Sequence, residues 1–152
     1  MAGELAGEAL CQVALVVRDI EAAATAWAET LGVPVPEARL TDPVEQAHTS
    51  YRGEPTAARA KLAFFRLGPV SIELIEPVGR PSTWHDGLRG PGAVHHLAFH
   101  VKDSRPVLQR LAALGLKVVQ TGDYRGGRYT YVDSTARLGV ALELLEDRPA
   151  GA

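Results

Sequence analysis

Residues 12–19 read QVALVVRD, and residues 96–103 repeat the pattern as HLAFHVKD. A second pair follows in the same order: residues 69–76 read PVSIELIE, and residues 139–146 read GVALELLE. Each of these four segments is a run of strand length, rich in apolar and β-branched residues. The chain therefore contains two copies of one unit, and each copy opens and closes on a predicted strand.

Each opening strand leads into a predicted helix. Asp19 and Asp103 stand where N-cap residues belong, and apolar residues recur at helical spacing after both of them. Gly32 and Gly115 end the two helical patterns. Further strands are predicted at 61–67 and 70–76 in the first copy, and at 116–120, 128–133 and 138–145 in the second. Each copy is thus strand, helix, then two or three strands.

The length of 152 residues favours a single domain over residues 1–152. We expect a first module at 9–78, a linker at 79–93 and a second module at 94–147. Matched positions lie 84 residues apart at the start (12 to 96) and 70 at the end (73 to 143), so the first copy is 14 residues longer. The extra residues fall in the polar stretch 38–60, which is predicted to be an irregular loop.

The composition excludes several classes of protein. With a net charge of −2, the chain has no basic excess for nucleic-acid binding, and it has no apolar run long enough to span a membrane. The single cysteine, Cys11, cannot form an intrachain disulfide, and the first residues lack the positive region of a secretory signal. We therefore expect a cytoplasmic protein.

One polar residue interrupts each of the four repeated strands: Gln12, Glu73, His96 and Glu143. Strand alternation places them opposite the bulky apolar face, and His95, which points the other way, is expected to be structural. A single such residue is more often solvated or hydrogen-bonded than a ligand. However, a buried unpaired carboxylate costs several kcal/mol, and no lysine or arginine shares the faces of the two closing strands. Four polar residues at equivalent positions favour a shared site that binds a divalent cation.

Four other residues are candidates for contact with a substrate: His100, Trp84, Tyr131 and Arg128. His100 follows His96 by two residues on the same face, and Tyr131 belongs to a neighbouring predicted strand. Trp84 either caps the cleft or packs in the core. Arg128 either binds an anion or is solvated beside a hairpin turn.

The chain resembles the vicinal oxygen chelate superfamily, which includes glyoxalase I, methylmalonyl-CoA epimerase, extradiol dioxygenases and bleomycin-resistance proteins. The resemblance covers about residues 9–147 and is greatest to the methylmalonyl-CoA epimerase branch. Its most specific segments are FFRLG at 64–68, IELIEP at 72–77, GAVHHLAF at 92–99 and LGVALEL at 138–144. The resemblance implies an α+β fold of two tandem βαβββ modules, whose curved mixed sheets surround a metal cleft. We also expect a homodimer.

The same resemblance implies that Gln12, Glu73, His96 and Glu143 bind one divalent metal ion, such as Zn, Co, Mn or Ni. This donor set is similar to that of zinc-type glyoxalase I, whereas epimerases usually carry His and Gln at the first two positions. Epimerases also use a second acidic base, which aligns near Ala57, where this chain has no acid.

We therefore expect a metal-dependent enzyme that transfers a proton next to a carbonyl group. The leading expectation is an acyl-CoA epimerase-type isomerase, with Glu143 as the base and Glu73 as the candidate second base. One alternative is a glyoxalase I-like lyase that acts on another carbonyl compound. The other is a metal-free protein that binds a small molecule and confers resistance to it.

Overall fold

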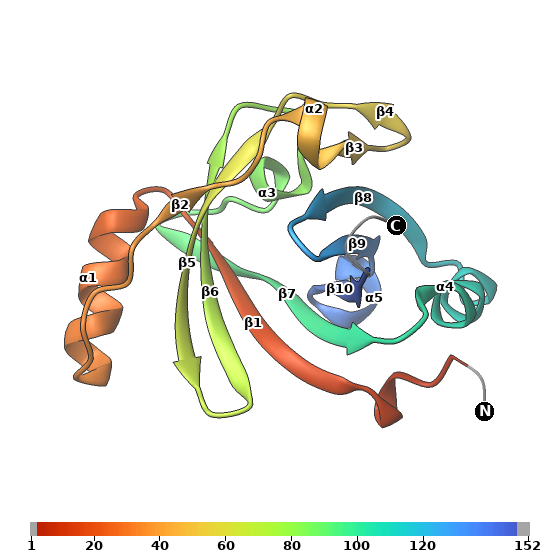
Figure 1. Cartoon of the computed structure of the whole chain (residues 1–152), viewed down its shortest axis with the longest axis horizontal. Coiled ribbons are helices and arrows are strands. Elements are labelled where there is room, and N and C mark those ends of the chain that lie inside the picture. Colours follow the sequence, from red (N-terminus) through yellow and green to blue (C-terminus); the bar gives the residue numbers. More distant parts are fainter. Residues whose placement is uncertain (1–2, 149–152) are drawn as a thin grey trace.

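The two copies of the sequence repeat fold as successive units in the computed structural model, which describes residues 3–148 (Figure 1). The first copy contains β1 (Ala9–Val17), α1 (Ile20–Leu31), β2 (Arg39–Leu40), β5 (Arg59–Leu67) and β6 (Val70–Val78). The second contains β7 (Gly92–Val101), α4 (Ser104–Ala113), β8 (Lys117–Tyr124), β9 (Gly127–Asp133) and β10 (Ala141–Asp147). The short elements are η1 (Leu5–Gly7), α2 (Val44–Ala47), β3 (Ser50–Tyr51), β4 (Glu54–Pro55), α3 (Thr83–Asp86) and α5 (Thr135–Leu138).

All strands join one curled mixed sheet, in the order β2-β5-β6-β1-β7-β10-β9-β8-β3-β4. The opening strands β1 and β7 pair antiparallel at its centre. Each opening strand also pairs parallel with the closing strand of its own copy, β1 with β6 and β7 with β10. The α+β fold with two repeated units is therefore confirmed, and the two units join within one chain.

The two longest helices, α1 and α4, cover one face of the sheet and leave the other to the site. Helix α1 packs on a cluster that includes Phe65 and Leu74, and α4 packs on a cluster that includes Val132 and Leu144. A third cluster contains Ala14, Ile75, Trp84 and Tyr131. This separation follows from the strand alternation, since the bulky side chains lie under the helices. Among the described residues, no helix is both long and apolar enough to cross a bilayer.

A duplicated glutamate fixes the start of each helix to the sheet. Oε2 of Glu76, on β6, accepts a hydrogen bond of 2.8 Å from the backbone N–H of Ile20, the first residue of α1. Oε2 of Glu146, on β10, accepts one of 2.6 Å from the N–H of Ser104, the first residue of α4. These carboxylates satisfy an N–H that has no partner inside the helix, and their charge is favourable at the helix N-terminus.

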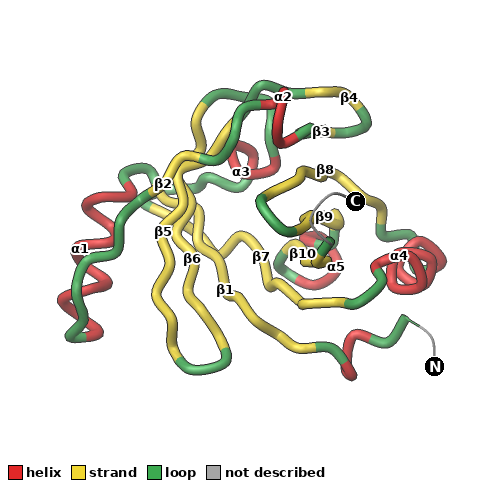
Figure 2. The backbone as a smooth tube through the Cα atoms, viewed as in Figure 1, coloured by secondary structure: helices red, strands yellow, loops and turns green. Residues whose placement is uncertain are grey.

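The long insertion of the first copy is not an irregular loop, contrary to the sequence prediction for residues 38–60. It contains β2, α2, β3 and β4, and it crosses to the second copy, where Ser50 and Tyr51 pair with Thr121 and Gln120 on β8 (Figure 2). These strands are two residues long, too short for an alternation pattern to predict them. They form because the edge of β8 offers backbone groups for pairing.

Two further boundaries differ from the prediction. The last strand begins at Ala141 rather than at 138, because residues Thr135–Leu138 form α5 and Gly139 ends it in a left-handed conformation with φ of 83°. Strand β8 extends to Tyr124, four residues beyond the predicted end at 120, because it pairs with β9 along its whole length.

The glutamate that begins α1 gives the first testable prediction. Replacing Glu76 by Ala leaves the Ile20 N–H without its acceptor, which should lower the free energy of unfolding by about 1–2 kcal/mol. E76Q keeps an acceptor oxygen and should lower the free energy of unfolding by less than E76A does. Urea denaturation measures both changes. The control is E37A, because Glu37 is exposed and its ion pair is with the exposed Arg39; equal stability of E76A and E37A would contradict the assignment.

Candidate metal centre

Two cross-strand rows of residues at the centre of the sheet build the site. The first row runs Glu73, Ala14, His96, Ala141 across β6, β1, β7 and β10. The second runs Ser71, Gln12, Ala98, Glu143 across the same strands. Side chains directly opposite in paired strands lie on the same face of the sheet. The buried alanines between the polar residues leave room for the longer side chains to meet.

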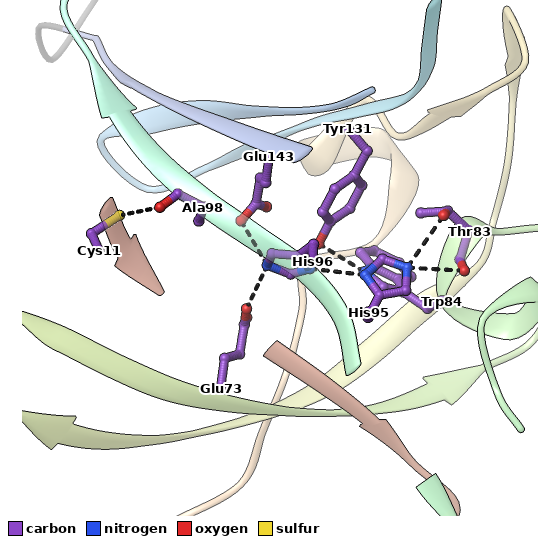
Figure 3. Close-up of polar contacts among 9 residues, drawn as sticks. All are labelled: Cys11, Glu73, Thr83, Trp84, His95, His96, Ala98, Tyr131 and Glu143. Atoms are coloured by element: carbon purple, nitrogen blue, oxygen red, sulfur yellow. Dashed lines mark hydrogen bonds and ion pairs between the residues drawn. The ribbon is translucent and has the colours of Figure 1, made fainter. Parts of the chain in front are cut away.

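Three of these side chains converge on one buried point (Figure 3). His96 Nε2 lies 3.2 Å from Glu73 Oε2 and 2.9 Å from Glu143 Oε2. One donor atom from each residue lies within 4.8 Å of the other two. His96 is fully buried, and Glu73 and Glu143 are only 5% and 4% exposed. Two carboxylates therefore share one imidazole away from water.

The hydrogen-bonding state of these atoms fits a metal ion. Among the described residues, Glu73 Oε2, His96 Nε2 and Glu143 Oε2 are buried without a hydrogen-bond partner of proper geometry. Buried polar atoms are normally satisfied, and an unsatisfied one costs free energy. Two carboxylates and an imidazole suit a divalent cation, whose charge the carboxylates would neutralise. The residues present therefore fit such an ion.

Without a metal ion, a proton takes the place of the cation. Burial, the largest effect, lowers the pKa of His96, but Glu143 and Glu73 outweigh it and raise that pKa to about 10. Burial also raises the pKa of Glu73, although His96 opposes this. At neutral pH the metal-free centre therefore holds an imidazolium between the two carboxyl groups.

The two glutamates open onto a cavity of about 350 Å³. Gln12 also lines it, on the same side of the sheet as Glu73 and Glu143. Trp84 and Tyr131, two of the predicted substrate contacts, lie in its wall, where the indole Nε1–H donates a hydrogen bond of 3.0 Å to the Tyr131 hydroxyl. The other lining residues are Leu40, Thr41, Asp42, Ala47, Thr49, Leu62, Phe64, Asp123, Tyr124, Tyr129 and Leu145.

Two other sequence-predicted residues lie outside this lining. His100 is exposed, and its Nε2 lies 3.1 Å from Asp147 Oδ1. Arg128 donates a hydrogen bond of 3.2 Å to the Thr121 hydroxyl and lies 3.9 Å from Asp123. The structure thus separates both side chains from the glutamates and His96.

Sequence reasoning missed Asp123 in the cavity lining and the contact that His48 makes with it. Asp123 lies in the part of β8 beyond the predicted strand end, and its Oδ2 is 3.0 Å from His48 Nδ1, in the insertion. Asp123 Oδ1 is buried without a hydrogen-bond partner among the described residues. No pattern in either segment indicates this contact, because the pairing of β3 with β8 creates it.

His95 was expected to be structural, and the structure places its ring against His96, a candidate metal ligand. Its Nδ1 lies 2.8 Å from Nδ1 of His96, although neighbouring residues on a strand point to opposite faces. Burial, followed by the charge of His96, lowers the pKa of His95 to about 3, so its ring is neutral.

Comparison with known proteins identifies relatives along most of the chain. Residues 11–132 match the family described as Glyoxalase/Bleomycin resistance protein/Dioxygenase superfamily. A 2-epi-5-epi-valiolone epimerase from an Actinomyces species is 29% identical over 152 residues, covering 95% of this chain and 81% of that protein. An ethylmalonyl-CoA/methylmalonyl-CoA epimerase from Cereibacter sphaeroides is 30% identical over 122 residues, covering 79% of this chain and 81% of that protein.

Solved structures share the fold at lower identity. The methylmalonyl-CoA epimerase from Mycobacterium tuberculosis superposes with a TM-score of 0.62 at 21% identity, covering 93% of this chain and 89% of that one. A methylmalonyl-CoA epimerase in complex with methylmalonyl-CoA and NH4+ superposes with a TM-score of 0.62 at 20% identity, covering 92% of this chain and 94% of that one. These likenesses support the architecture of the repeated units.

The protonated state of His96 gives a prediction for metal binding. Because its pKa in the folded, metal-free protein is about 10, a cation must displace a proton at any pH below that value. The affinity for Co²⁺ should therefore rise about tenfold per pH unit between about pH 6 and 8. Calorimetry in buffers of different ionisation enthalpy should count at least one proton released. The control is H85Q, because His85 is exposed; an affinity independent of pH would contradict the prediction.

Proposed function

The chain belongs to the glyoxalase/bleomycin resistance protein/dioxygenase superfamily, and on that premise we propose that it is a metal-dependent epimerase. In this proposal it transfers a proton at a carbon next to a carbonyl group. The observation that carries the proposal is the convergence of Glu73, His96 and Glu143, whose two glutamates also line a cavity. The two epimerases among the curated relatives support the reaction type.

Glu73, His96 and Glu143 would hold the metal ion, and Gln12 is the fourth candidate ligand. When bound, a divalent cation would polarise the substrate carbonyl and stabilise the negative charge that develops on its oxygen. Gln12 is supported by its place on the cavity wall, beside Ala98 and in the same cross-strand row as Glu143. An amide oxygen adds a ligand without adding charge, so the two carboxylates would still balance a divalent ion.

The chain's own carboxylates supply the proton transfer. We assign Glu143 as the base that removes the proton next to the carbonyl and Glu73 as the candidate second acid–base group. Figure 3 shows the two carboxylates approaching His96 from opposite sides. Epimerisation needs a proton removed from one face of a carbon and returned to the other. The raised pKa of Glu73, caused first by burial, suits a group that must hold a proton and release it.

The cavity suits a small acyl group as substrate. Leu62, Phe64 and Trp84 contribute apolar side chains to its lining, and Glu73 and Glu143 contribute carboxylates. About 350 Å³ is at the lower end of the range for ligand pockets. The acyl end of a coenzyme A thioester fits this volume, so the remainder of the coenzyme would lie outside. We therefore place an acyl-CoA of the methylmalonyl type first.

A specific observation favours a second candidate, a substrate without coenzyme A. The relative that covers 95% of this chain is named for the epimerisation of a valiolone, which is not a thioester.

The donor set of Gln12, Glu73, His96 and Glu143 also keeps a glyoxalase I-like lyase as an alternative. A metal-free binding protein is the third alternative, and it predicts that the purified chain binds no divalent ion even after reconstitution.

Hydrogen exchange in deuterated water tests the proposal. The metal-loaded protein should exchange the α-hydrogen of methylmalonyl-CoA, and E143Q should reduce the exchange rate about 100-fold or more because the base is lost. The control is E29Q, a change on the exposed face of α1 that should leave the rate unchanged. NMR or mass spectrometry of the recovered substrate measures the exchange.

The outcomes separate the candidates. Exchange by E143Q at the wild-type rate would show that Glu143 is not the base. No exchange with acyl-CoA esters, but exchange with a polyhydroxylated cyclic ketone, would favour the second candidate. No exchange with either compound by a metal-loaded protein would contradict the epimerase proposal.

A further inference from the structure

We infer that His95 is a positioning residue, which holds His96 in the tautomer whose Nε2 lone pair faces Glu73 and Glu143. Only that tautomer of a neutral imidazole can bind a metal ion through Nε2. The inference rests on the proposed metal site and assigns a role to the neighbour of one ligand. It follows from a chain of hydrogen bonds that begins outside the site, at the backbone carbonyl of Thr83.

The contact between the two rings requires one donor and one acceptor. His95 Nδ1 and His96 Nδ1 are 2.8 Å apart, and both rings are buried. A neutral imidazole carries one N–H and one acceptor nitrogen. If His96 Nδ1 donates, the Nε2 of its neutral ring is left with a lone pair. If His95 Nδ1 donates instead, His96 must carry its proton on Nε2.

The far side of the His95 ring decides between these patterns. His95 Nε2 lies 3.0 Å from the carbonyl oxygen of Thr83, and a carbonyl oxygen can only accept. The proton of His95 therefore belongs on Nε2, and its Nδ1 accepts from His96. The reverse pattern would let the Thr83 hydroxyl, 3.2 Å away, donate to Nε2, but it would place the lone pair of Nε2 against that of the carbonyl oxygen.

Packing holds the His95 ring in the orientation that these hydrogen bonds need. The ring stands edge-on to His96 and to Tyr131, with centroid distances of 5.1 and 5.3 Å. On its other side is Gly87, where a Cβ atom would lie 2.7 Å from His95 Cδ2 and 3.2 Å from the Thr83 carbonyl oxygen. Any side chain at position 87 would therefore displace the ring or the carbonyl.

The Thr83 carbonyl is itself fixed by both copies of the repeat. The Thr83 N–H donates a hydrogen bond of 2.8 Å to Oε1 of Gln120, which is buried on β8 of the second copy. Pro81 lies two residues before Thr83 in the same connection. Its carbonyl oxygen accepts a hydrogen bond of 2.8 Å from the Thr56 hydroxyl of the first copy. The segment that joins the copies thus sets the proton position on a candidate metal ligand.

Two substitutions at position 95 test the inference. H95L removes the acceptor and should weaken Co²⁺ binding about 10–100-fold, the usual effect of losing a hydrogen bond to a metal-bound histidine. H95N should stay within about threefold of wild type, because the Asn Oδ1 stands where the imidazole Nδ1 stood and still accepts from His96. G87A keeps both histidines, displaces the ring, and should weaken binding as H95L does.

A second measurement reads the tautomer without any metal. Long-range ¹H–¹⁵N NMR of the metal-free wild-type protein at neutral pH should show His95 protonated on Nε2 only, and His96 protonated on both ring nitrogens as the imidazolium. A His95 protonated on Nδ1, or H95L binding Co²⁺ as tightly as wild type, would overturn the inference. If the wild type bound no Co²⁺, the proposed function would fail, while the NMR pattern would still decide the role of His95. The NMR result also stands if H95L does not fold.

Discussion

The structure depends on the burial of two carboxylates against a single imidazole. Glu73 and Glu143 come from the closing strands of the two copies, and His96 comes from the opening strand of the second. Two buried negative charges cannot remain without compensation. In the metal-free protein, the raised pKa of His96, about 10, supplies one positive charge by holding a proton. A divalent cation would supply two, and this difference is the physical basis of the proposed affinity for metal ions.

The repeat explains how one short motif serves both the fold and the site. In each closing strand, two glutamates stand three residues apart, so alternation directs them to opposite faces of the sheet. Glu73 and Glu143 face the cavity, while Glu76 and Glu146 accept hydrogen bonds from the first residues of α1 and α4. The same segment thus fixes a helix on one face and presents a candidate ligand on the other.

Much of this arrangement is predictable because it depends on local periodicity. Strand alternation brings Glu73, His96 and Glu143 to one face, and the structure places their donor atoms together. What the sequence does not reveal depends on pairing between distant segments. The insertion forms β3 against β8, which brings His48 to Asp123 at the cavity. His95 faces away by alternation, yet its ring contacts His96 because the connection that carries Thr83 folds back against it.

The most direct test is a crystal structure of the Co²⁺-soaked protein with anomalous diffraction recorded at the cobalt absorption edge. The account predicts one strong peak at the centre of the sheet, with ligand distances of about 2.0–2.2 Å to His96 Nε2 and to carboxylate oxygens of Glu73 and Glu143. The Nδ1 of His95 should remain within hydrogen-bond distance of His96. A peak elsewhere, or no peak at this point, with His96 still between the two carboxylates, would contradict the central claim.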